Sequence, residues 1–166
     1  MARKGADVVS KWWGLLALGA LAVGVIAVVV AMNWPAETRS NRLRRPEDAQ
    51  LLVLGQKVYA AQCAACHGPR LEGQPNWRER GADGRLPAPP HDASGHTWHH
   101  PDEELFRITK HGVAKAANLK NYESAMPAYE DRLSDEEIVA VLSWIKSTWP
   151  PEIRARVDRI NAEASR

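Results

Sequence analysis

Cys63-Ala64-Ala65-Cys66-His67 is the stretch that decides the fold of this 166-residue chain. It has the C-x-x-C-H spacing by which a polypeptide holds a haem covalently, because two thiols three positions apart can each add across one haem vinyl group. The histidine after the second cysteine then lies under the porphyrin, where its imidazole can bind iron. The chain has two cysteines, and the motif uses both. The motif therefore predicts one covalently bound haem with His67 as an iron ligand.

Two other kinds of site use a C-x-x-C pair. A structural zinc site would need a second such pair, which the sequence lacks. A thioredoxin-type redox pair would be expected beside a strand–helix unit, and no strand pattern occurs near Cys63. Haem attachment is the interpretation that we follow.

The charge of the chain is unevenly distributed along it. Residues 1–46 carry seven Lys/Arg and two Asp/Glu, whereas residues 47–149 carry 11 basic and 15 acidic side chains. The basic character belongs to the amino-terminal segment, and the body of the chain is mildly acidic. This distribution argues against nucleic-acid binding, which requires a basic face with base-reading or stacking groups.

The amino-terminal segment has the composition of a membrane anchor. From Trp12 to Trp34, 23 residues carry no charge, and as a helix they would span roughly 33 Å, enough for the hydrocarbon core. Tryptophans at both ends suit the two membrane interfaces. A cleavable signal peptide would have an apolar core of only about 7–15 residues and a small-residue cleavage site. We therefore expect a cytoplasmic amino terminus at 1–11 and an uncleaved transmembrane helix at 12–34.

Charge alone does not orient this anchor, because arginines and lysines lie on both sides of it. The haem motif decides the orientation, since covalent haem attachment takes place outside the bacterial cytoplasm. Residues 35–46, bounded by Pro35 and Pro46, read as a linker with an r.m.s. reach of roughly 18 Å. We expect a single-pass protein of the bacterial inner membrane whose domain, residues 47–149, lies in the periplasm close to the membrane.

Three helices are predicted in that domain. The first begins at Pro46, followed by acidic residues, and runs into Cys63. The second begins at 101–104 and ends before Gly112. The third is opened by a capping box at Ser134 and ends near Trp149. Residues 113–125 read as a loop. The tail 150–166 has apolar residues at helical spacing, which indicates a short helix that lies either on the domain or on a partner.

Residues 68–100 are rich in glycine and proline and predict an irregular loop wrapped around a cofactor. Four histidines in or beside this loop raise the question of a second metal: His91, His96, His99 and His100. No carboxylates or cysteines accompany them at a definite ligand spacing, so surface positions or hydrogen bonding near haem are the favoured roles. Trp98 is a further candidate for hydrogen bonding near the haem, through its indole N–H.

A second axial ligand for iron can be sought by elimination. Of the three methionines, Met1 and Met32 belong to the terminus and the apolar span, which leaves Met126 in a Met-Pro pair. A lone methionine more often fills a gap in a core. A thioether ligand, however, suits an electron carrier because it keeps iron six-coordinate. One of the five other histidines, or no sixth ligand, remains as the alternative.

From about Glu47 to Trp149 the chain resembles class I c-type cytochromes, particularly the bacterial membrane-anchored monohaem type. The resemblance rests on two motifs and on the capped last helix: Gly55-x-x-x-Tyr59-x-x-x-Cys63-Ala64-Ala65-Cys66-His67-Gly68, Met126-Pro127-Ala128-Tyr129, and Val141-x-x-Trp144-Ile145-Lys146. It implies an all-α class I cytochrome c fold, one haem c held by Cys63 and Cys66, and iron bound by His67 and Met126.

The resemblance also implies two contacts within the domain. Its first and last helices would cross with Gly55 and Tyr59 against Val141 and Trp144. A proline carbonyl of the loop would accept the imidazole N–H of His67, with Pro87, Pro89 and Pro90 as the candidates.

The function expected is electron transfer rather than catalysis. The chain would carry single electrons between a quinol-oxidising cytochrome complex and a terminal oxidase, with no nucleic acid and no small-molecule substrate. One alternative is a fixed haem subunit of an oxidase, reductase or dehydrogenase complex, which the short linker favours. Another is a haem enzyme or gas sensor with an open sixth site.

Overall fold

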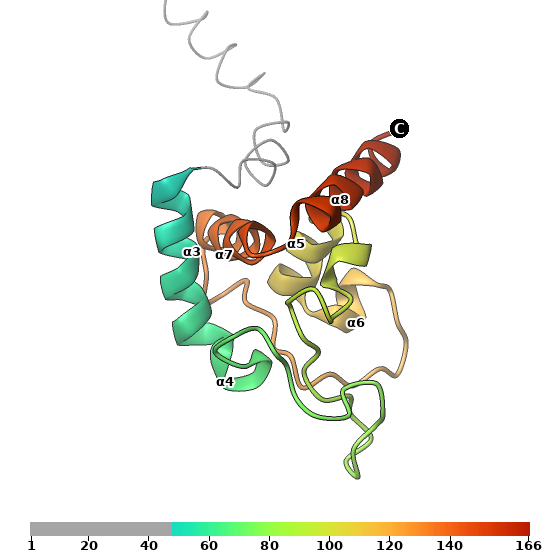
Figure 1. Cartoon of the computed structure of the whole chain (residues 1–166). Helices are drawn as coiled ribbons and strands as arrows, with labels where there is room; N and C mark the ends of the chain where they lie inside the picture. The colour runs from blue at the N-terminus through green and yellow to red at the C-terminus, as the bar shows by residue number, and fades with distance from the viewer. Residues whose placement is uncertain (1–47) are drawn as a thin grey trace, which may run out of the picture. The chain divides into compact units, whose positions relative to one another are not determined.

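A computed structural model of the chain describes residues 48–166 (Figure 1). The predicted cytoplasmic terminus, anchor and linker at 1–11, 12–34 and 35–46 lie outside the described residues. Within residues 48–166, no helix is both long enough and apolar enough to cross a bilayer. All regular elements in that range are helical, as expected for an all-α domain.

The first described helix, α3 (Ala49–Gln62), leads directly to the cysteine motif. Asp48 caps it, because Oδ1 of Asp48 accepts hydrogen bonds from the backbone N–H groups of Gln50 and Leu51 at 3.0 and 3.2 Å. The prediction that the helix begins at Pro46 was therefore wrong by one turn, since the Asp48 side chain takes the N-cap role. A short helix, α4 (Ala64–His67), follows and contains the motif.

The middle of the chain contains three short elements: η1 (Thr97–His99), α5 (Asp102–His111) and α6 (Val113–Ala116). α5 has the expected bounds, with acidic residues in its first turn and Lys110 and His111 in its last, which complement the helix dipole. The prediction of a loop over residues 113–125 was wrong at its start, because residues 113–116 form the single helical turn of α6 after Gly112.

The last helix of the predicted domain, α7 (Asp135–Ser147), has the predicted capping box. Oγ of Ser134 accepts the backbone N–H of Glu137 at 3.2 Å, and the Glu137 carboxylate accepts the backbone N–H of Ser134 at 2.8 Å. The hydrogen bond from Ser134 lowers the pKa of Glu137. Sequence alone therefore located this helix start correctly.

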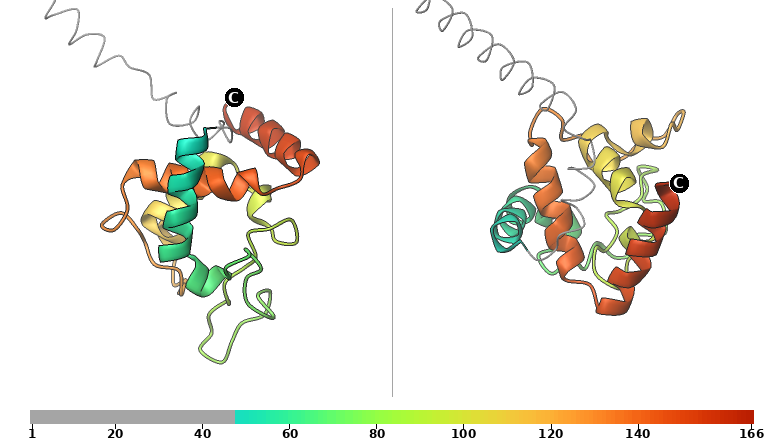
Figure 2. Two further views of the ribbon diagram at one scale, coloured as in Figure 1. Left: turned by 60° about the vertical axis from the view of Figure 1, so that its left-hand side comes forward. Right: turned by 90° about the horizontal axis from the view of Figure 1, so that it is seen from above.

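α3 and α7 cross at close range, as both views in Figure 2 show. The crossing point is Gly55, where a Cβ atom would lie 2.1 Å from the carbonyl oxygen of Ala140 and 2.7 Å from Cβ of Trp144. Next to it, the rings of Tyr59 and Trp144 lie 4.8 Å apart. The expected crossing is confirmed for Gly55, Tyr59 and Trp144. The core extends from it through Phe106, Ile138 and Val141.

A further helix, α8 (Pro151–Ala164), follows α7 and packs near η1. Val157 of α8 is fully buried. Asn161 accepts the backbone N–H of Asp102 through Oδ1 at 2.7 Å, which satisfies a donor at the start of α5 that has no side-chain cap. The tail is thus packed on the domain as a helix.

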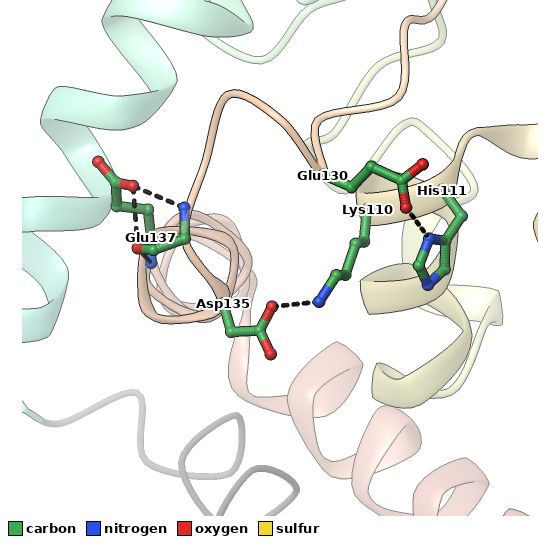
Figure 3. Close-up of polar contacts among 6 residues, drawn as sticks. Lys110, His111, Glu130, Asp135 and Glu137 are labelled. Carbon is green, nitrogen blue, oxygen red and sulfur yellow. Dashed lines mark hydrogen bonds and ion pairs between the residues drawn. The ribbon is translucent and has the colours of Figure 1, made fainter.

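An ion pair and a histidine–carboxylate hydrogen bond join the C-terminal end of α5 to the start of α7 and to the segment before it (Figure 3). Nζ of Lys110 lies 2.6 Å from Oδ1 of Asp135, and Nδ1 of His111 lies 2.8 Å from Oε2 of Glu130. The backbone N–H of Tyr129 and of Glu130 also donate to Lys110 O. The segment after Met126 is therefore fixed against α5.

Gly55→Ala should destabilise the domain even though alanine favours helix formation by about 1 kcal/mol over glycine. The added methyl meets backbone atoms of Ala140, so α3 and α7 must move apart, and overpacking of this kind costs about 1–3 kcal/mol or more. Denaturant unfolding of the haem-loaded protein measures the effect. Gln56→Ala, on the exposed side of α3, is the control. Equal stability of the two variants would contradict the close crossing.

Candidate functional site

The two cysteines and His67 are brought together by the junction of α3 and α4. Cys63 is the last residue before α4, and its carbonyl accepts the backbone N–H of Cys66 at 3.1 Å and of His67 at 2.9 Å. Both cysteines are free thiols, Cys63 partly buried and Cys66 exposed. Gly68, with φ of 79°, ends the turn in a conformation that favours glycine. The turn therefore presents two thiols and one imidazole from five consecutive residues.

The His67 ring is buried and held in one orientation. Its Nδ1 lies 2.9 Å from the carbonyl oxygen of Pro89. A carbonyl can only accept, so Nδ1 carries the proton and Nε2 keeps its lone pair for a metal. Burial lowers the pKa of His67, which keeps the imidazole neutral. Of the three candidate prolines, the structure selects Pro89.

Pro89 reaches His67 because the long loop folds back on itself. The backbone N–H of Gly73 donates to His67 O at 2.8 Å, that of Gln74 to Ala88 O at 2.8 Å, and that of His91 to Leu71 O at 2.8 Å. These hydrogen bonds bring the two ends of the loop together on either side of Pro89. The Trp149 indole N–H donates to the carbonyl oxygen of His91 at 2.7 Å, which ties the same stem to the end of α7.

His91 contributes a second imidazole to the site. Its ring is stacked on that of His67, with centroids 4.0 Å apart and planes inclined by 22°. Nδ1 of His91 lies 2.7 Å from Oγ1 of Thr97. Burial lowers the pKa of His91 to about 3, and the neighbouring His67 and His96 act in the same direction. The second imidazole is therefore neutral across the physiological range.

Met126 lies in the loop between α6 and α7, far from the cysteine motif in the sequence. It is joined to the motif indirectly. It is partly buried against the core, and its backbone N–H donates to Oγ of Ser124 at 3.1 Å. Three residues later, the Tyr129 hydroxyl donates to the carbonyl oxygen of Gln62, next to Cys63, at 2.8 Å. This bond connects the methionine segment to the cysteine segment. The sequence offered no signal for it.

The other three histidines of the loop contact aromatic and acidic side chains, and the rings of His96 and His100 meet edge to face at 5.4 Å. His96 stacks on Trp77, His100 pairs with Glu104 at 3.3 Å, and His99 stacks on Trp98. Within residues 48–166, no group of three or more His, Cys, Asp or Glu side chains is arranged to hold a metal ion. Trp98 Nε1 is buried without a hydrogen-bond partner. A buried donor of this kind requires an acceptor.

The model of the cytochrome c family matches residues 52–149, more than half of the chain. The chain belongs to the cytochrome c family. Membership implies haem c and electron transfer, and the free thiols of Cys63 and Cys66 have the spacing that covalent attachment requires. Comparison with curated proteins and with solved structures gave no match.

The residues of this cytochrome c fit a haem on two grounds besides the motif. His67 is neutral and presents Nε2, as an axial ligand must. The unpartnered indole N–H of Trp98 can donate to a carboxylate, the group that haem propionates supply. Sequence reasoning found the cysteines and His67 but missed the ring stacking of His91, since nothing in a Pro-rich loop indicates which side chain will face His67.

Proposed function

We propose that this cytochrome c is a single-pass, membrane-anchored monohaem carrier. Residues 12–34 would anchor it in the bacterial inner membrane, with its domain in the periplasm. It would pass single electrons from a quinol-oxidising cytochrome complex to a terminal oxidase. The observation that carries the proposal is the hydrogen bond from His67 Nδ1 to Pro89, which leaves Nε2 for iron four residues from the first of two free thiols.

In this proposal each residue of the site has one task. Cys63 and Cys66 would hold the haem through two thioethers, and His67 and Met126 would bind its iron. Bound haem c supplies a reversible one-electron couple. Pro89 fixes the ring of His67, while the Tyr129–Gln62 hydrogen bond holds the methionine segment near the attachment segment. None of these tasks transfers a proton or changes a substrate.

Met126→Ala should leave covalent haem in place but remove the sixth ligand. We expect the ferric protein to lose the long-wavelength charge-transfer band of thioether-ligated haem and to become partly high-spin, because iron then has five protein and porphyrin ligands. The reduction potential should also fall. Optical spectra of both oxidation states measure this. Leu119→Ala, at an exposed position of the preceding loop, is the control and should resemble the wild type.

A low-spin spectrum that survives Met126→Ala unchanged would contradict the assignment of this ligand. Ready binding of carbon monoxide by the intact ferrous protein would instead favour the haem enzyme or gas sensor, which needs an open site.

The alternative of a fixed subunit is favoured by the 12-residue linker, 35–46. Co-purification with stoichiometric partner subunits from a detergent extract would support the subunit over the shuttle.

A further inference from the structure

The proposed haem site needs no histidine besides His67, yet the ring of His91 lies directly against it. It is stacked face to face on His67, with centroids 4.0 Å apart. Since Pro89 O holds Nδ1 of His67, the two contacts restrain the ring of His67 from different directions. The hydrogen bond holds its edge, and the stacked ring restrains its face.

Four contacts hold His91 itself in position. Its backbone N–H donates to Leu71 O at 2.8 Å, and its carbonyl accepts the Trp149 indole N–H at 2.7 Å. Its Nδ1 lies 2.7 Å from Thr97 Oγ1, and the ring of Tyr59 meets it edge-on at 6.4 Å. Backbone and side chain are both fixed, so the stacking geometry is built into the fold rather than adopted by a mobile side chain.

A stacked neutral ring affects the two oxidation states of iron differently. An imidazole bound to ferric iron carries more positive charge than one bound to ferrous iron. The π face of an aromatic ring attracts positive charge placed over it, and it does so more strongly where water is excluded. The contact therefore stabilises the oxidised form more than the reduced form.

We propose that His91 is a positioning residue for the axial ligand His67, and that its stacked ring lowers the reduction potential and fixes the plane of the ligand. The proposal rests on His67 being an iron ligand, as in the proposed function. It assigns to His91 a role toward the haem iron through His67, without direct contact with iron.

The test compares His91→Leu with His91→Phe in the haem-loaded protein. Leucine removes the π face, so the equilibrium between oxidised and reduced protein should shift about three- to tenfold toward the reduced form. At 59 mV per tenfold for one electron, this is a rise of ~30–60 mV. Phenylalanine keeps a π face, so its potential should return most of the way to that of the wild type. Redox titration measures both.

Two further variants keep the test decisive. Leu119→Ala, at an exposed position outside the loop, should leave the potential unchanged. Thr97→Val removes the hydrogen bond that orients His91 while leaving both imidazoles in place. We expect it to shift the paramagnetic NMR signals of the haem methyl groups, which report the plane of the axial imidazole, even if the His91 variants fail to fold.

The outcomes are separable from those of the proposed function. Equal potentials in wild type and His91→Leu, or equal rises in the leucine and phenylalanine variants, would overturn the role of the stacked ring. Unaltered haem methyl signals in Thr97→Val would overturn the role in fixing the ligand plane. Failure of the proposed function would already be seen in the wild-type spectrum, as the absence of low-spin haem.

Discussion

Replacing both cysteines, Cys63→Ser with Cys66→Ser, should abolish covalent haem attachment. These residues are the only thiols of the chain, so no other side chain can form a thioether. Both are free in the structure, one at each end of a single helical turn. We expect no haem to remain with the polypeptide after denaturation, as measured by haem staining of a denaturing gel, against full retention in the wild type.

The single variants provide the matched controls for this prediction. Cys63→Ser and Cys66→Ser each retain one thiol, so each should keep haem through one thioether. One vinyl group then stays conjugated, and the band of the ferrous pyridine complex should lie between those of the double variant and the wild type. Haem retained on the gel by the double variant would show that attachment does not use these thiols.

The part of the site that could be predicted from the sequence is the part made by local geometry. Cys63, Cys66 and His67 lie within five residues, and the turn that joins them is fixed by backbone hydrogen bonds to Cys63 O. Likewise, the capping box at Ser134 needs only a residue three positions away. In both cases the sequence spacing directly determines the spatial relation.

The rest of the site depends on contacts between distant segments. Three prolines were equivalent in sequence, and Pro89 is selected because the loop stem pairs Gln74 with Ala88 and Leu71 with His91. No periodic pattern reports such pairing in a loop without strands. The same holds for Tyr129, whose hydroxyl bonds to the carbonyl of Gln62. The crossing of α3 and α7 at Gly55 also joins distant segments, and it was expected from the resemblance to class I c-type cytochromes.

Lys146→Met should be the most destabilising single substitution among these predictions. Nζ of Lys146 on α7 lies 2.8 and 2.7 Å from the two carboxylate oxygens of Asp102 on α5, and both side chains are only 4% exposed. Methionine fills similar space but leaves a buried carboxylate without its ammonium partner. Removing one member of a buried pair costs about 3–5 kcal/mol, which denaturant unfolding of the haem-loaded protein can measure.

The loss should also depend on pH, with a sign set by Asp102. Burial raises the pKa of Asp102 and Lys146 opposes that rise, so the substitution removes the opposing interaction and raises the pKa further. A carboxyl whose pKa is higher in the folded than in the unfolded state binds protons more tightly when folded. The stability of the variant should therefore be greatest at low pH and fall as pH rises through the folded-state pKa.

Lys110→Met is the matched control, because Lys110 also pairs with an aspartate of the same domain, Asp135 at 2.6 Å. Those side chains are 26% and 39% exposed. Solvent screens such a pair, so we expect a cost of about 0–1 kcal/mol. The double variant Lys146→Met with Asp102→Asn should recover part of the loss, since it removes the buried charge. Equal losses in Lys146→Met and Lys110→Met would mean that burial does not set the strength of the Asp102 pair.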